Sequence, residues 1–203
     1  MISLLLVQAA LGGDRQLDLH VAGQGTDDPG WNLLSEDGHL SSVGLRAGLP
    51  VHKYVTVLAG WEHGASGMEF NTYDQSGDDG SELSFRTGSY INQFQLGVKS
   101  GWGPSHWAKF YGVASADVLY GIVRVDDDPD DDENPGQVQA EGVGVGALGA
   151  VGFETAVPLG KSGVSLAFYG ELGYTWTAPF NLGDVATIQV DGVSGRVGTG
   201  VRF

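Results

Sequence analysis

The densest group of reactive side chains in the sequence is an acidic run, DDDPDDDENPG, at residues 126–136. Seven carboxylates fall within eight consecutive positions of this run, and carboxylate oxygens are the ligands that calcium and magnesium prefer. An EF-hand loop needs glycine at its sixth position and glutamate at its twelfth, and no register of the run supplies both. We therefore expect weak, multi-site binding of calcium or magnesium by six carboxylates: Asp126, Asp127, Asp128, Asp130, Asp131 and Asp132.

Two other interpretations of this run stay open. Consecutive like charges repel one another, so the run also fits a solvated loop that holds no ligand. General surface acidity, as in a salt-adapted organism, is the third interpretation. No cofactor is expected beyond these weakly bound cations.

A second motif, GVGALG at residues 144–149, matches the GxGxxG pattern of dinucleotide-binding sites. Such a site needs a helix directly after the glycines, so that the helix N-terminus meets the pyrophosphate. Here alternation of period two continues through Val151 and Phe153. The motif therefore predicts a glycine-rich strand and no dinucleotide site.

Composition excludes several classes of protein. The 203 residues carry a net charge of −15, with 34 glycines and no cysteine. Nucleic acid requires a basic surface, so it is excluded as a partner. The absence of cysteine excludes a disulfide scaffold, thiol chemistry and cysteine-bound zinc. Hydrophobic residues make up 41% of the chain, which favours a folded domain over disorder.

Eight segments alternate between apolar and polar residues, which is the period of a strand with one apolar face. In the last segment, Val197, Thr199, Val201 and Phe203 share one parity. Most segments extend over about ten residues, enough for a tilted strand to cross a bilayer. The segments lie at residues 17–22, 42–49, 55–62, 90–99, 110–122, 143–154, 164–176 and 196–203.

One stretch before the last segment breaks this alternation. Ile188 and Val190 have the opposite parity to Val197 and Val201. A bulge near residues 192–195 would reset the phase. Alternatively, residues 185–191 project above the membrane.

The connectors between the segments alternate between long and short, which places all long connectors at one end of a barrel. The long connectors hold 17 of the 25 acidic residues and no lysine or arginine. All four lysines, Lys53, Lys99, Lys109 and Lys161, lie in or near the short turns. The longer connectors are residues 24–40, 64–85, 125–138 and 177–187, and the short ones are 50–53, 100–106 and 158–162.

Aromatic residues gather near the ends of the segments, where a membrane barrel carries two interfacial girdles. The predicted interfacial aromatics are Trp61, Tyr90, Trp102, Trp107, Tyr120, Tyr174 and Trp176.

The C-terminal sequence RVGTGVRF resembles the targeting signal of bacterial outer-membrane β-barrel proteins, with Gly198, Val201 and Phe203 at the signal positions. Together with the eight alternating segments, it predicts an all-β fold, an eight-stranded antiparallel transmembrane up-and-down β-barrel of the small OmpA/OmpX type. The resemblance implies a Gram-negative outer membrane, with lipid and lipopolysaccharide as partners. It also implies insertion by the outer-membrane assembly machinery, which reads the last strand in that family.

The first residues are predicted to form a truncated signal peptide at residues 1–12. The apolar stretch 2–7 is followed by small residues suited to cleavage. Residues 13–203 then form a single barrel domain. The alternative is that residues 1–12 are the apolar start of the first strand or a short helix.

Charged residues occupy the face of the strands that would line the lumen. The interior of an eight-stranded barrel is just wide enough for side chains to fill, and charges there must be paired or hydrated. A polar network is expected in the lumen from Arg46, Glu62, Asp117, Glu154, Glu171 and Arg196. The network predicts a polar plug, and the alternative is a narrow passive channel for water or small solutes.

An enzymatic alternative rests on His39-Leu40-Ser41. This triplet resembles the His-x-Ser sequence of the lipid A deacylase family of eight-stranded barrels, with Glu36 or Glu62 available to orient the histidine. It lies at the start of the second segment, whereas the family carries it in a late strand. We therefore expect no catalytic residues. We expect a non-enzymatic barrel whose acidic extracellular loops contact divalent ions, lipopolysaccharide or other surface partners.

Overall fold

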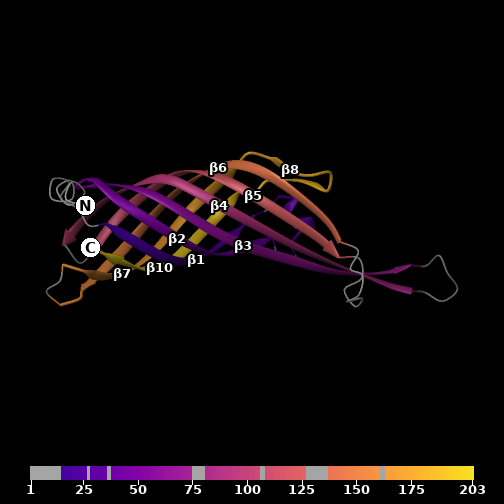
Figure 1. Ribbon diagram of the computed structural model, residues 1–203, viewed down its shortest axis with the longest axis horizontal. Coiled ribbons are helices and arrows are strands. Elements are labelled where there is room, and N and C mark those ends of the chain that lie inside the picture. Colours follow the sequence, from indigo (N-terminus) through magenta and orange to yellow (C-terminus); the bar gives the residue numbers. More distant parts are fainter. Residues whose placement is uncertain are drawn as a thin grey trace, which may run out of the picture.

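The computed structural model describes residues 15–26, 28–35, 38–74, 81–105, 108–126, 137–160 and 163–203. Eight antiparallel strands form a closed barrel in the order β1-β10-β7-β6-β5-β4-β3-β2 (Figure 1). This confirms the predicted eight-stranded antiparallel barrel. The barrel strands are β1 Gln16–Gly25, β2 His39–His52, β3 Val55–Asp74, β4 Ser81–Ser105, β5 Ala108–Asp126, β6 Gln137–Pro158, β7 Ser165–Thr177 and β10 Gly192–Arg202.

The first and last strands close the sheet along one seam. β1 pairs with β10 throughout, with Leu17 opposite Val201 and Val21 opposite Val197. Arg15 and Phe203 add two backbone hydrogen bonds of 2.9 and 3.0 Å beyond the strand ends. Closure therefore gives each of the eight strands a paired neighbour on both sides within the barrel wall. We call the end that holds Arg15, Phe203 and the turn at residues 53–54 the turn end, and the opposite end the loop end.

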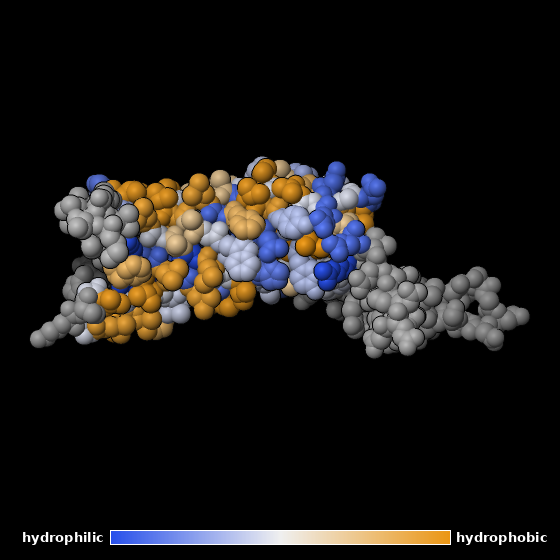
Figure 2. Space-filling model, in the orientation of Figure 1, coloured by the Kyte–Doolittle hydropathy of each residue, from blue (hydrophilic) through white to orange (hydrophobic). Residues whose placement is uncertain are grey.

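The barrel is apolar outside and polar inside. Leu96 and Val151 face outward and are 65% and 67% exposed, whereas Arg46 and Glu62 face the lumen and are 3% and 4% exposed. On the face seen in Figure 2, apolar side chains cover much of the wall and give way to polar residues toward the loop end. No helix in the described part of the chain is long and apolar enough to cross a membrane.

One connector differs from its prediction. The alternation predicts a long loop over residues 64–85, but β3 continues to Asp74 and β4 begins at Ser81, with these two residues paired. The two strands project together beyond the rest of the barrel (Figure 1). A strand that extends past the apolar band needs no apolar face, so alternation of hydrophobicity could not mark its end.

The loop end of the lumen is filled by an apolar cluster, which we call the outer plug. Two connectors supply its inner part: a 3-10 helix, η1 Trp31–Leu33, and a hairpin of β8 Phe180–Leu182 with β9 Ala186–Ile188. Lumen-facing residues of the barrel strands surround them. The plug consists of Trp31, Leu34, Leu40, Ile91, Leu119, Val123, Ala140, Phe180, Leu182, Ile188 and Val190.

The outer plug explains the phase change before the last strand. Ile188 belongs to the separate β8–β9 hairpin, and both Ile188 and Val190 are 1% exposed. β10 begins afterwards, at Gly192. These apolar residues therefore belong to a connector that packs in the outer plug, and a bulge in the last strand is not the reason for their parity.

Side-chain hydrogen bonds fasten the plug across the seam. Gln24 Nε2 at the end of β1 donates to the carbonyl of Val190 at 2.6 Å. Asp28 Oδ1 accepts from the backbone N–H of Trp31 at 2.8 Å and from that of Gln189 at 3.2 Å. The connector after β1 and the connector before β10 are thus tied to each other.

Glycines on the lumen face of β6 make room for the hairpin. A Cβ at Gly144 would lie 2.5 Å from Phe180 Cδ1, and a Cβ at Gly142 would overlap the carbonyl oxygen of Asn181. Gly144 is the first residue of the GxGxxG match. The absence of a side chain there lets the Phe180 ring pack against β6. Residues 144–149 lie inside β6, as the continuing alternation predicted.

We expect Gly142→Ala to displace the β8–β9 hairpin, because the obstructing atom is backbone and cannot rotate away. Overpacking of this kind lowers the free energy of unfolding by about 1–3 kcal/mol. Urea unfolding of the refolded barrel, followed by tryptophan fluorescence, measures the change.

The control is Gly149→Ala on the same strand, where an added Cβ meets no atom within 4 Å. It should leave stability unchanged. Equal effects of the two variants would contradict the packing role of Gly142.

Candidate functional site

The lumen below the outer plug contains a network of buried ion pairs. Arg46 on β2 faces Glu171 on β7 across the interior, and its Nη1 and Nη2 donate to Oε2 and Oε1 at 3.0 and 2.6 Å. This bidentate geometry is the strongest form of an arginine–carboxylate pair. Arg46 Nε also lies 3.5 Å from Asp18 Oδ2. One guanidinium therefore links three strands of the barrel.

A second group surrounds Glu154 toward the turn end. Arg202 donates to Glu154 from Nη2 at 2.6 Å and from Nε at 3.2 Å, and to Asp18 from Nη1 at 2.5 Å. Lys99 Nζ donates to the same Glu154 Oε2 at 2.6 Å and lies 4.0 Å from the centre of the Tyr111 ring. Glu154 is thus shared between two cations.

A third group is centred on Glu62. Its Oε1 accepts from Arg196 Nε at 2.8 Å and from Gln95 Nε2 at 3.0 Å, and it lies 3.0 Å from His20 Nε2. Ser42 Oγ donates to the other carboxylate oxygen at 3.3 Å. Four side chains from four strands therefore converge on one carboxylate.

Charges of opposite sign nearly balance inside the lumen. Among the described residues, the buried carboxylates are Asp18, Glu62, Asp117, Glu154 and Glu171, and the buried lysine and arginine cations are Arg46, Lys99, Arg196 and Arg202. Removing an unpaired charge from water is very costly, so a charged group in a narrow lumen needs an opposite charge or a hydrogen-bond partner. We call these nine residues, with His20, the lumen network.

The structure brings together five of the six residues expected in the lumen network. Arg46 pairs with Glu171, Glu62 pairs with Arg196, and Glu154 pairs with Lys99 and Arg202. Asp117 is buried but makes no ion pair with any described residue, and it accepts a hydrogen bond from Ser115 at 2.9 Å.

Sequence reasoning missed the role of Asp18, which bridges Arg46 and Arg202. It also missed Tyr111, which donates to Glu171 at 2.9 Å. Asp18 lies two residues before His20 on the same face of β1, so its parity could have identified it. The parity of Tyr111 places it inward, but nothing in the sequence indicated its partner.

Buried side chains occupy the lumen, with the lumen network below and the outer plug above. The cavity beside Glu62, Gln93 and Ser194 has a volume of about 10 Å³, which is room for about one water molecule. A second apolar cluster in the lumen consists of Leu58, Tyr111, Val113, Leu148 and Ala150. The outer plug closes the loop end above.

The predicted interfacial aromatics lie on the outer face, except for Trp107, which lies outside the described residues. Trp61, Trp102, Tyr174 and Trp176 are exposed, and Tyr90 and Tyr120 are half-buried. His63 stacks between Trp61 and Tyr90, with ring centres 6.1 and 6.0 Å apart. Arg124 covers the Tyr90 ring at 5.9 Å. These contacts form an aromatic patch on β3, β4 and β5.

The residues of the C-terminal signal have distinct positions. Val201 and Phe203 face outward and are 36% and 46% exposed. Gly198 faces the lumen, where a Cβ would lie 2.6 Å from Tyr169 Cζ. A glycine at this signal position therefore leaves space for a buried tyrosine.

The proposed histidine–serine pair does not form a catalytic arrangement with Glu62. His39 and Ser41 lie exposed at the start of β2, while Glu62 points into the lumen and binds Arg196 and His20. Strand geometry places Glu62 on the opposite side of the wall, so the suggestion that it orients His39 is wrong. Glu36 lies outside the described residues.

Most of the predicted cation-binding run lies outside the described residues. Asp126 is the last residue of β5, and the other five aspartates fall in the undescribed residues 127–136. The described residues contain no cluster of three or more histidine, aspartate or glutamate side chains arranged to hold a metal. The predicted signal peptide, residues 1–12, also lies outside the described residues.

Comparison with known proteins shows the fold. No known protein family matches the sequence, and no curated protein matches it. One similar solved structure is that of Ail, the attachment invasion locus protein of Yersinia pestis, in complex with the heparin analogue sucrose octasulfate. Its TM-score is 0.51 at 12% identity, over 94% of this chain and 99% of that one. A major outer membrane protein from Thermus thermophilus has a TM-score of 0.52 at 18% identity, over 93% of this chain and 99% of that one. The chain therefore has the fold of small outer-membrane barrels.

We expect Arg46→Met to destabilise the barrel, because it leaves the Glu171 carboxylate buried beside only a tyrosine hydroxyl. Loss of one partner of a buried ion pair costs about 3–5 kcal/mol. The double variant Arg46→Met/Glu171→Gln should recover a large part of that loss, since no unpaired charge remains. Urea unfolding in lipid vesicles measures both variants.

Lys109→Met provides the control, because Lys109 is exposed and makes no ion pair with a described residue. A double variant that is as unstable as the single one would contradict the pairing.

Proposed function

We propose that this chain is a non-enzymatic barrel of a bacterial outer membrane that acts through its acidic loop end. The observation that carries the proposal is the filled lumen. Because ion pairs and the outer plug occupy the interior, the surfaces available for function are the two ends and the outer wall.

Several features support the outer-membrane location. The apolar band and the exposed aromatics fit a barrel wall in lipid. The signal residues Gly198, Val201 and Phe203 end β10, the strand that the outer-membrane assembly machinery would read. In this orientation the turn end faces the periplasm and the loop end faces outside.

The acidity of the loop end supports the proposed partners. The longer connectors carry 17 of the 25 acidic residues and no lysine or arginine. Calcium or magnesium held by the carboxylates of residues 126–132 would link the loop end to the anionic groups of lipopolysaccharide. Ail was solved with a polyanion, and the acidic connectors of this chain would repel such a ligand in the absence of bridging cations.

Calcium should raise the thermal stability of the purified barrel, because a ligand that binds only the folded state stabilises it. At a calcium concentration about tenfold above Kd the gain is about 1.4 kcal/mol. Heat-dependent gel migration with and without calcium provides the measurement. Replacing the six aspartates of residues 126–132 with asparagine should abolish the gain.

The matched control is Asp184→Asn, at an exposed residue in the turn between β8 and β9. It should retain the full calcium effect. An unchanged melting temperature in the wild-type chain would leave the solvated-loop interpretation.

A planar bilayer that contains the refolded barrel should stay electrically silent. Ion pairs and the outer plug occupy the lumen, and the ion pairs would have to separate in a low-dielectric interior for a water path to open. Folding is verified in the same preparation by heat-dependent gel migration. Reproducible conductance steps would favour the alternative, a narrow passive channel.

A further inference from the structure

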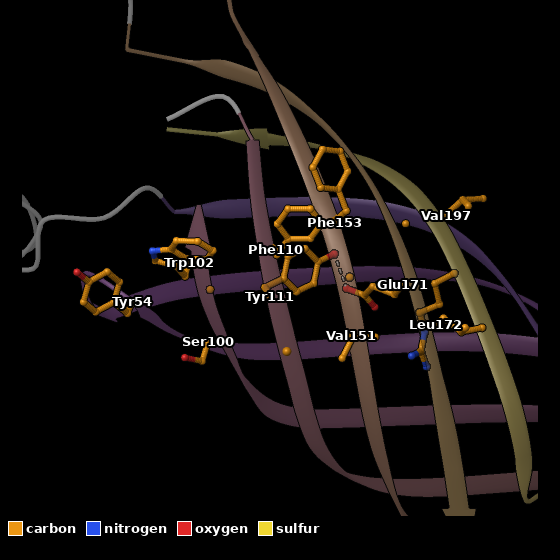
Figure 3. A pocket seen from close by; sticks show the side chains of 15 residues that line it. Tyr54, Ser100, Trp102, Phe110, Tyr111, Val151, Phe153, Glu171, Leu172 and Val197 are labelled. Carbon is orange, nitrogen blue, oxygen red and sulfur yellow. Dashed lines mark hydrogen bonds between the residues drawn. The ribbon is translucent and has the colours of Figure 1, made fainter. Parts of the chain in front are cut away.

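A groove on the outer wall lies beside the lumen network but is separated from it by the sheet. It has a volume of about 960 Å³ and runs over β4, β5, β6, β7 and β10. Figure 3 shows Phe110, Phe153, Leu172 and Val197 around it, with Tyr111 and Glu171 joined behind the strands. Its volume is within the range of small-molecule sites. We call it the glycine groove.

Two outward-facing glycines form the floor of this groove. The nearest atoms to an added Cβ are 3.8 Å away at Gly112 and 3.9 Å away at Gly170. The floor is therefore open backbone, without a side chain above it. Phe110 and Phe153 stand beside it in tilted contact, with ring centres 5.1 Å apart.

The side chains that rise around the floor are apolar and accessible. Leu172 and Val197 are 61% and 60% exposed, and Phe110 is 57% exposed. Hydrocarbon is the chemistry that fits such walls, since the groove offers few polar groups to a sugar or an ion. An acyl chain would fill a depression that neighbouring lipids otherwise bridge.

A basic turn lies at one end of the glycine groove. Tyr54 lines the groove, and Lys53 Nζ lies 4.5 Å from the centre of its ring. The Tyr54 carbonyl accepts a hydrogen bond from the Gly101 N–H at 3.1 Å, which holds the turn against β4. Trp102, 70% exposed, lines the groove as well.

Lysine, tyrosine and tryptophan together are the residues that mark the headgroup level of a membrane. Lys53 is exposed and makes no ion pair with a described residue, so its ammonium is free to meet an anionic phosphate. The apolar groove and the cation at its end match the two parts of a phospholipid.

We propose that the glycine groove binds one phospholipid of the periplasmic leaflet, with an acyl chain along Gly112 and Gly170 and the phosphate at Lys53. The assignment of the leaflet rests on the proposed function, which places the turn end in the periplasm. Lipopolysaccharide would contact the barrel at its opposite end, where the acidic connectors lie.

Native mass spectrometry of the barrel tests this proposal after extraction from vesicles of phosphatidylethanolamine and phosphatidylglycerol. The wild-type chain should retain one phospholipid. Gly112→Leu/Gly170→Leu fills the groove, and an added Cβ at either position makes only an ordinary van der Waals contact. The variant should lower the retained fraction roughly tenfold or more through loss of apolar contact. Lys53→Gln should weaken retention of phosphatidylglycerol by several-fold.

Gly149→Leu is the matched control, because it adds a leucine to an outward glycine of β6 outside the groove. It should retain lipid as the wild-type chain does. Equal retention by the groove-filled variant, or no retained lipid in a folded wild-type barrel, would overturn the proposal. A wild-type dimer that separates when the groove is filled would assign the groove to a second copy of the chain and overturn it as well.

Folding is verified by heat-dependent gel migration in every sample. A folded wild-type barrel that retains no lipid would therefore contradict the glycine groove and leave the proposed loop-end function unaffected. Failure of the calcium test counts against the loop-end function alone, because that test concerns the opposite end of the barrel.

Discussion

Backbone hydrogen bonding in hydrocarbon is the constraint on which this structure depends. Lipid offers no partner for an N–H or a carbonyl, so a sheet that crosses a membrane must pair every strand on both sides. The seam between β1 and β10 meets this requirement from Gln16 to Gln24. The apolar exterior and the polar interior follow, because alternate residues of a closed sheet face lipid and lumen in turn.

The lumen network follows from the small diameter of the barrel. Eight strands leave an interior that side chains can fill, and charged side chains in such a space must neutralise one another. Arg46 and Glu171 do so across the interior, while Asp18 and Glu154 are each shared between two cations. The ion pairs connect β1, β2, β3, β4, β6, β7 and β10 from within, and the backbone ladders connect neighbouring strands in the wall. The fold thus uses its interior for cross-linking, and its outer wall remains available for contact with lipid.

The sequence predicted the barrel because alternation and connector length are local features. The order of the strands and the outward direction of Leu96 and Val151 followed from them. The pairing of Arg46 with Glu171 could not be predicted. It depends on which residues of distant strands lie at the same height in the barrel once the staggered sheet has closed. The same reason hid the contact of Asp18 with Arg202. The outer plug could not be predicted from the parity of Ile188 and Val190, which fits a bulge or a projecting segment equally well. In the structure these residues belong to a connector that folds back into the lumen.

The fastening of the outer plug across the seam affects how the barrel comes apart. The connectors that enter the lumen are those next to β1 and β10, and Gln24 is bound to Val190 between them. Separation of the two strands therefore requires apolar side chains such as Trp31 and Ile188 to leave their packed cluster at the same time. Such coupling raises the barrier to opening, so the lifetime of the native barrel is set by the withdrawal of a connector as well as by the hydrogen bonds of the wall. The seam joins the two ends of the sheet in the wall, and the outer plug joins the same two ends from the interior.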